Sequence, residues 1–296
     1  MKIAGLVLLA LVAFGQSSSF KSDPPHQCDS CADWNKPREP FKIYGNTYFV
    51  GTDGLSSVLV VGDAGLILLD GGLEQSAALI DANIRKLGFR TEDVKLIVNS
   101  HGHFDHAGGI AALQRASGAT VAASPSGAQA LQRGENTTDD PQYGYGKAAN
   151  GFPPVKNVTI IKDNQVLRVG NIAITAVFTP GHTPGATSWT WQACEGTKCL
   201  NIVYADSISA VSADGFKFTA QPEVITLFRR SVTRLGELPC DIVVSTHPSA
   251  TGLDEKIKKR AAMKAGEPDP FIDHGCKALA TTAMKNLDAR IAEEKK

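Results

Sequence analysis

Along some segments of the chain every second residue is hydrophobic, which predicts strands, and along others hydrophobic residues recur every three or four positions, which predicts helices. The two kinds of segment follow one another along the sequence. Residues 41–50 alternate between apolar and polar side chains around Gly45 and Asn46, the pattern of a β-hairpin. Other short apolar runs are bounded by glycine or aspartate and predict further strands. These runs cover residues 57–61, 66–69, 94–98, 158–161, 166–169, 172–178, 187–192, 200–204 and 242–245.

Between the strands, apolar residues recur at steps of three and four, which is the spacing of one helix face. One such helix ends at Gly88, which suits a left-handed C-terminal residue, and another begins at Pro222, which suits a first turn. Residues 109–116 predict a short helix. The predicted inward positions of the three longer helices are Leu73, Ala77, Ile80, Ile84 and Leu87, then Val224, Leu227, Phe228 and Leu235, then Leu279, Ala283, Leu287 and Ile291. Sheets covered by helices on their outer faces predict an α/β fold, a four-layer αββα sandwich.

The composition is that of a compact enzyme-sized protein. The 296 residues are 43% hydrophobic and 20% charged, which is enough to bury a substantial core. The formal net charge is zero and the chain has no basic block, so we expect no nucleic-acid partner. A monomer is the default expectation.

The first residues predict an export signal. Lys2 precedes the apolar stretch 3–14, and the polar run 16–19 follows it. The stretch is too short to span a bilayer. We therefore expect a signal peptide over residues 1–15, or to about residue 19, and then a single domain over 16–296. The mature protein is expected in the periplasm or outside the cell, with no membrane anchor.

Six cysteines in an exported chain predict disulfides. One pair flanks a four-residue turn between two predicted strands, so its members face each other across a hairpin. A second pair would tie the start of a strand to the last helix. The third is a Cys-x-x-Cys that either closes on itself or serves as a zinc knuckle or redox motif, for which the sequence shows no further context. The expected pairs are Cys194 with Cys199, Cys240 with Cys276, and Cys28 with Cys31.

A cluster of metal-binding residue types follows the apolar run 94–98. Residues 101–106 read His-Gly-His-Phe-Asp-His, and imidazole nitrogen and carboxylate oxygen are ligands that Zn²⁺ accepts. One histidine after a strand is more often structural, but four polar candidates in six positions are costly to bury without a partner. Two further histidines follow predicted strands. The six candidate ligands, His101, His103, Asp105, His106, His182 and His247, suggest two metal ions side by side.

This pattern resembles the metallo-β-lactamase superfamily and, within it, the secreted zinc β-lactamases of subclass B3. The similarity runs from about Trp34 to the C-terminal helix. It implies the αββα metallo-β-lactamase fold already expected from the periodicity. It also implies two zinc sites: His101, His103 and His182 would bind the first zinc, and Asp105, His106 and His247 the second.

The segment 204–210, Tyr-Ala-Asp-Ser-Ile-Ser-Ala, separates this subclass from its relatives. Glyoxalase II and the lactonases use an aspartate near here to bridge both metals, and subclass B1 enzymes use a cysteine, which is absent. The resemblance implies that Ser207 and Ser209 bind the substrate carboxylate; the alternative is a strand end capped by small hydroxyls. Asp206 stays open, because a one-residue shift would make it the bridging ligand.

Two further residues follow from weaker signals. Asp70, in Leu-Leu-Asp-Gly-Gly, either accepts a hydrogen bond from a ligand imidazole or is a turn residue. Gln142, in the loop 134–154, either lies near the substrate, as in similar enzymes, or is a solvated loop residue. Some relatives carry a cysteine near Asp53 that pairs with an N-terminal cysteine. His26 and His274 lack a metal motif and are expected to be surface or structural residues.

The expected reaction is hydrolysis of the β-lactam amide of penicillins, cephalosporins and carbapenems, which confers antibiotic resistance. Two zinc ions about 3.5–4 Å apart would share a water whose pKa falls toward ~7, giving a zinc-bound hydroxide that Asp105 orients. The first alternative is another dizinc hydrolase of the superfamily, a thioesterase or lactonase. A zinc-storing protein without turnover is the second.

Overall fold

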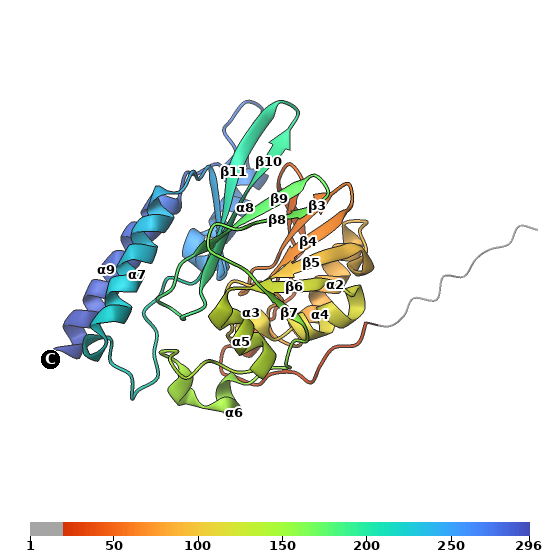
Figure 1. The fold of residues 1–296 in the computed structure, drawn as a ribbon. Helices are drawn as coiled ribbons and strands as arrows, with labels where there is room; N and C mark the ends of the chain where they lie inside the picture. Colours follow the sequence, from red (N-terminus) through yellow and green to blue (C-terminus); the bar gives the residue numbers. More distant parts are fainter. Residues whose placement is uncertain (1–19) are drawn as a thin grey trace, which may run out of the picture.

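The computed structural model describes residues 20–296 and shows two mixed β-sheets packed face to face, with helices on both outer faces (Figure 1). This arrangement confirms the predicted four-layer αββα sandwich. The predicted signal peptide, residues 1–15 or to about 19, lies outside the described residues.

The first sheet has seven strands in the spatial order β1-β2-β3-β4-β5-β6-β7. Its first four strands are paired antiparallel, and β4 to β7 are parallel. The carboxyl ends of the parallel strands therefore meet at one edge. The strands are β1 (Phe41–Tyr44), β2 (Thr47–Phe49), β3 (Val58–Gly62), β4 (Gly65–Leu69), β5 (Val94–Val98), β6 (Thr120–Ala123) and β7 (Val158–Ile160).

The second sheet has five strands in the order β12-β11-β10-β9-β8. Only β11 and β12 are parallel within it, so their carboxyl ends lie side by side. The strands are β8 (Val166–Val169), β9 (Ile172–Phe178), β10 (Thr187–Glu195), β11 (Lys198–Ala205) and β12 (Ile242–Ser245).

Helices cover each sheet from outside. On the first sheet lie α2 (Ser76–Lys86), α4 (Ile110–Ser117) and α5 (Pro125–Arg133), and on the second lie α7 (Pro222–Glu237) and α9 (Cys276–Glu294) (Figure 1). The remaining helices and 3-10 turns lie before the first strand or in the segments between these elements. These are α1 (Cys31–Trp34), α3 (Phe104–Ala107), α6 (Lys147–Asn150), α8 (Leu253–Ala261) and the 3-10 turns η1 (Thr91–Asp93), η2 (Tyr143–Tyr145), η3 (Phe218–Ala220) and η4 (Pro248–Thr251). Over residues 20–296, no helix combines the length and apolar character needed to cross a bilayer.

The main core lies between the two sheets. Phe49 and Trp189 are completely buried there, and a side chain of this size contributes about 2–3 kcal/mol when it leaves water. The indole N–H of Trp189 donates to the carbonyl of Asn99, 3.1 Å away, so this core residue also fixes the backbone that follows β5.

Most predicted elements are confirmed, and the differences have local causes. The helix predicted from Leu73 begins at Ser76 and ends before Gly88, whose φ of +86° is the left-handed conformation expected there. The prediction that Leu227 points inward was wrong, since 42% of it is exposed. The face of α7 that packs on α9 carries Phe228, as predicted, together with Val232 one helical turn later.

Three disulfides join the cysteine pairs expected from the sequence. Cys28 pairs with Cys31 beside α1, and Cys194 with Cys199 across the β10–β11 hairpin. Cys240 pairs with Cys276, with their Cα atoms 6.2 Å apart, and this bond attaches the first residue of α9 to the segment that enters β12.

His26 fastens the N-terminal segment to the domain and has the structural role expected of it. Its ring stacks on Phe104 with centroids 4.1 Å apart, and its Nε2–H donates to the carbonyl of Ala149, 3.1 Å away. The free Nδ1 lone pair therefore faces Oε1 of Glu74 at 3.6 Å. This arrangement favours a protonated Glu74 carboxyl over a carboxylate.

Glu74 makes stability depend on pH in a defined direction. Burial raises the pKa of Glu74 from 4.5 to about 7. The pKa of Glu74 is therefore higher in the folded protein than in the unfolded chain. Its contribution to stability is complete at a pH below the unfolded value, and it is lost as the pH rises through the folded value. The glutamine in Glu74→Gln stays neutral at every pH. We therefore expect the Tm of this variant to fall less than that of wild type between about pH 5 and about pH 8, with a difference of a few degrees.

Thermal unfolding of zinc-saturated protein at the two pH values measures this difference. Glu237→Gln, a matched change at an exposed residue of α7, should behave as wild type. Equal pH dependence of Tm in Glu74→Gln and wild type would contradict the assignment.

Candidate metal centre

A buried carboxylate shapes the loop that leaves β5. Asp70, at the end of β4, has a φ of +59° and is completely buried. One of its oxygens accepts hydrogen bonds from the backbone N–H of Ser100 (2.7 Å) and the side chain of Asn99 (2.9 Å), and the other accepts from the hydroxyl of Tyr204 (2.9 Å). The start of the loop is thereby held to both sheets.

Of the two roles that the sequence left open for Asp70, the structure favours the turn residue, with φ +59°, over a hydrogen bond to a ligand imidazole. Within residues 20–296 its carboxylate has no imidazole partner, because the loop backbone and Tyr204 already occupy both oxygens. Asp70 positions the loop that carries His101, and it does not orient the ring itself.

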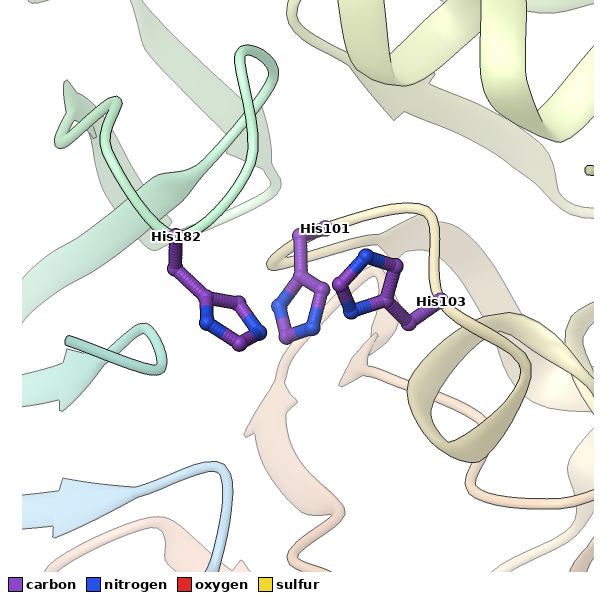
Figure 2. Close-up of side chains that lie close together, drawn as sticks. All are labelled: His101, His103 and His182. Carbon is purple, nitrogen blue, oxygen red and sulfur yellow. The ribbon is translucent and has the colours of Figure 1, made fainter. Parts of the chain in front are cut away.

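Three histidines from two distant parts of the chain converge at the edge of the sandwich. His101 and His103 lie on the loop after β5, and His182 lies between β9 and β10. One ring nitrogen of each lies within 4.8 Å of the others, and all three residues are buried. Figure 2 shows the three rings turned toward one another.

A second group adjoins the first. His101, Asp105 and His106 also bring their donor atoms within 4.8 Å of one another. His247, which follows β12, places Nε2 3.4 Å from Oδ2 of Asp105, and its ring centroid is 4.8 Å from that of His106. The structure therefore brings all six predicted ligands together at one edge.

Outer hydrogen bonds fix which nitrogen of each ring faces the centre. In four of the five rings, one nitrogen is held by a partner from another loop, which leaves the other nitrogen for a metal. These contacts are His101 Nδ1 to Asp206 Oδ1 (2.7 Å), His103 Nε2 to Asp140 Oδ2 (3.1 Å), His182 Nδ1 to the Ser209 carbonyl (2.8 Å) and His247 Nδ1 to the Gly54 carbonyl (3.3 Å).

The surroundings keep His101, His182 and Asp105 in the forms that bind metal. Burial, followed by the neighbouring imidazoles, holds the pKa of His101 well below its usual range, and the same causes lower the pKa of His182 to about 3. Burial alone would raise the pKa of Asp105, but His106 and His247 outweigh it and hold that pKa well below normal. Neutral imidazoles and an ionised carboxylate are the ligand states that zinc requires.

Buried ring nitrogens without a hydrogen-bond partner also indicate a zinc site. Nε2 of His101 and both ring nitrogens of His106 are buried without a hydrogen-bond partner among the described residues. Such orphaned polar atoms are expensive unless something binds them. Nitrogen and carboxylate donors in groups of three match the number of protein ligands at a catalytic zinc.

Asp206 lies behind His101. Its Oδ1 is bonded to the outer nitrogen of that ring, and its side chain is completely buried. Burial, together with the Asp70 carboxylate, raises the pKa of Asp206 well above its usual range. Asp206 therefore contacts the outer nitrogen of His101 and belongs to neither of the two groups of donors.

The predicted substrate-binding residues lie beside the cluster. Ser207 Oγ shares a hydrogen bond with Thr246 Oγ1 (2.8 Å), and Ser209 Oγ lies 3.3 Å from Nδ1 of His182. Both serines line a cavity that also contains His247. The backbone N–H of Gln142 donates to Asp140 (2.7 Å), and its side chain makes no hydrogen bond in the described part of the chain.

Sequence reasoning missed two residues of the site. Asp140 is buried against His103, and the Trp34 ring lies 5.5 Å from that of His247. The run Thr-Thr-Asp-Asp-Pro around Asp140 has no periodicity and does not follow a strand, so nothing marked it as close to the histidines.

Comparison with known proteins identifies close relatives. Residues 50–195 match the family described as the metallo-beta-lactamase superfamily. The structure resembles the Rm3 metallo-beta-lactamase with 51% identity, a TM-score of 0.87, and coverage of 91% of this chain and 100% of that one. It also resembles MEM-A1, a subclass B3 metallo-beta-lactamase from a soil metagenome library, with 44% identity, a TM-score of 0.84, and coverage of 89% of this chain and 99% of that one. The metallo-beta-lactamase MIM-1 from Novosphingobium pentaromativorans is 42% identical, with a TM-score of 0.79 and coverage of 88% of this chain and 93% of that one.

A more distant similarity covers less of the chain. An acyl-coenzyme A thioesterase, MBLAC2 of Gallus gallus, is 29% identical over 102 residues. The match covers 31% of this chain and 35% of the length of that relative.

The contact between Asp140 and His103 predicts a measurable effect on metal binding. We expect Asp140→Ala to weaken zinc affinity roughly tenfold to a hundredfold, because the ring loses the partner that orients it. Titration against a chromophoric chelator measures the affinity. Asp139→Ala, a change at the exposed neighbour, is the control and should bind zinc as wild type does. Equal zinc affinities in the two variants would contradict this role.

Proposed function

Because the chain belongs to the metallo-beta-lactamase superfamily, we propose that it is a β-lactamase that opens the lactam ring of penicillins, cephalosporins and carbapenems. The observation that carries the proposal is the cluster of six ligands, arranged as two adjoining groups at one edge of the sandwich. The subclass B3 relatives, similar over nearly their whole length, support the same substrate class.

Two zinc ions are the proposed cofactors. His101, His103 and His182 hold the first, and Asp105, His106 and His247 hold the second. Bound zinc supplies a Lewis acid and lowers the pKa of a bound water from about 15.7 toward ~7.

Asp105 is the proposed catalytic residue of the chain. Its carboxylate lies 3.2 Å from His106 and 3.4 Å from His247, and it stays ionised at neutral pH for the reasons given above. An ionised oxygen at this position accepts a hydrogen bond from the attacking water and orients it toward the lactam carbonyl.

Ser207 and Ser209 are the proposed anchors of the substrate carboxylate. Their hydroxyls lie on the loop after β11, beside His182 and His247, and a hydroxyl donates readily to a carboxylate. Gln142 approaches from the loop that carries Asp140. The enzyme acts as a monomer in the periplasm or outside the cell, after removal of the signal peptide, and confers resistance to β-lactam antibiotics.

A thioesterase is the second candidate, favoured by the similarity to the avian acyl-coenzyme A thioesterase. Hydrolysis of a carbapenem and of S-lactoylglutathione, each with and without a chelator, separates the two candidates. We expect carbapenem turnover that disappears with the chelator and returns with zinc. Thioester turnover without lactam turnover would overturn the proposal, and zinc binding without either activity would indicate a storage protein.

The role of Ser207 predicts a change in KM. Ser207→Ala removes one hydrogen bond to a charged group, so we expect KM for a carbapenem to rise roughly tenfold with a smaller change in kcat. Ser249→Ala, on the exposed turn after His247, is the control and should leave both constants unchanged. An unaltered KM in Ser207→Ala would remove this serine from the substrate site.

A further inference from the structure

A cavity of about 280 Å³ extends from the metal cluster to the last helix. At one end it is lined by His247 and by Ser207 and Ser209, the proposed carboxylate anchors. At the other end α9 contributes Thr282 and Asn286, and no role has yet been assigned to either.

The lining of this cavity is apolar with a polar rim. Ile208, Leu279 and Ala283 form the apolar part. Thr282 and Asn286 are four residues apart, so they lie one above the other on the same face of α9. Among the residues that line the cavity, His247 is the only one with an ionisable side chain, and none is a lysine, arginine, aspartate or glutamate. The cavity therefore suits an uncharged and partly apolar group.

Asn286 offers hydrogen-bonding groups that the protein itself does not use. Thr282 donates its hydroxyl to the carbonyl of Ala278 within the helix, at 3.1 Å. The side-chain amide of Asn286 has no hydrogen-bond partner in the part of the chain that the structure describes, and the residue is exposed. It is free to bind a ligand in the cavity.

The wall formed by α9 is fixed at both ends. Cys276, at its start, is bonded to Cys240. Near its other end Glu294 accepts hydrogen bonds from the backbone N–H of Thr219 (2.8 Å) and Phe218 (3.2 Å). Such a wall holds its shape when a ligand enters, which is how a binding cavity discriminates between ligands of different size.

The chemistry of β-lactams indicates what enters the cavity, given the proposed function. In these substrates the carboxylate is carried by a carbon of the ring fused to the lactam, and in cephalosporins and carbapenems the adjacent ring carbon carries a variable substituent. A carboxylate held by Ser207 and Ser209 brings this substituent to the mouth of the cavity. The acylamino side chain of penicillins and cephalosporins is attached to the lactam ring itself, away from that carbon.

We propose that the cavity beside α9 receives the fused-ring substituent of the substrate, and that Thr282 and Asn286 determine which substituents the enzyme accepts. This inference rests on the proposed β-lactamase function. It assigns a specificity role to a helix that contributes no metal ligand.

Two cephalosporins with the same acylamino side chain test the proposal. One carries a methyl group on the variable ring carbon, and the other carries an acetoxymethyl group. Asn286→Trp fills the cavity, so we expect the ratio of kcat/KM for the larger substrate to that for the smaller to fall roughly tenfold. Thr282→Phe, on the same rim, should change the ratio in the same direction.

Ala289→Trp is the matched control, because Ala289 is exposed on α9 and does not line the cavity. It should keep the wild-type ratio. Zinc content and Tm verify that each variant is folded and loaded with metal. A wild-type ratio in both rim variants, or an equal change in Ala289→Trp, would overturn the assignment while leaving the β-lactamase function intact. Failure of the wild-type enzyme to open either cephalosporin would overturn both proposals.

Discussion

The whole site depends on the buried carboxylate of Asp70, which joins the two sheets where their loops meet. It binds the backbone that leads to His101 and the hydroxyl of Tyr204 in the opposite sheet. Burying a carboxylate is costly unless hydrogen bonds replace its water, and here three donors do so. The histidines lie on loops that follow strands of both sheets, and their rings must meet within a few ångströms. The position of one sheet relative to the other therefore sets the geometry of the cluster.

The imidazoles are oriented by partners from three separate loops. Asp206, Asp140 and the carbonyls of Ser209 and Gly54 each hold one outer nitrogen. Each of these outer hydrogen bonds restricts the rotation of its ring, which lowers the cost of ordering the donors around a metal.

The sequence predicted the layers and the residues that converge at the edge of the sandwich, because both leave short-range signals. Periodicity marks the strands and helices, and four of the ligands fall within the six residues 101–106. The partners of the ligands leave no such signal. Asp140 lies in an irregular loop, and the contacts of Asp70 depend on the spacing between two sheets, which no local pattern encodes. The short strand β6 was missed because its small residues resemble a helix segment as much as a strand.

The disulfide between Cys240 and Cys276 has a practical consequence for recombinant production. In a host whose cytosol keeps thiols reduced, the ligands on the loops would still assemble, while the last helix would lose its covalent link to the segment before β12. Under the role proposed for the cavity beside α9, such material would keep the metal-binding residues and differ from the oxidised protein in the wall of that cavity. Metal content alone is therefore an insufficient criterion of native quality for this protein.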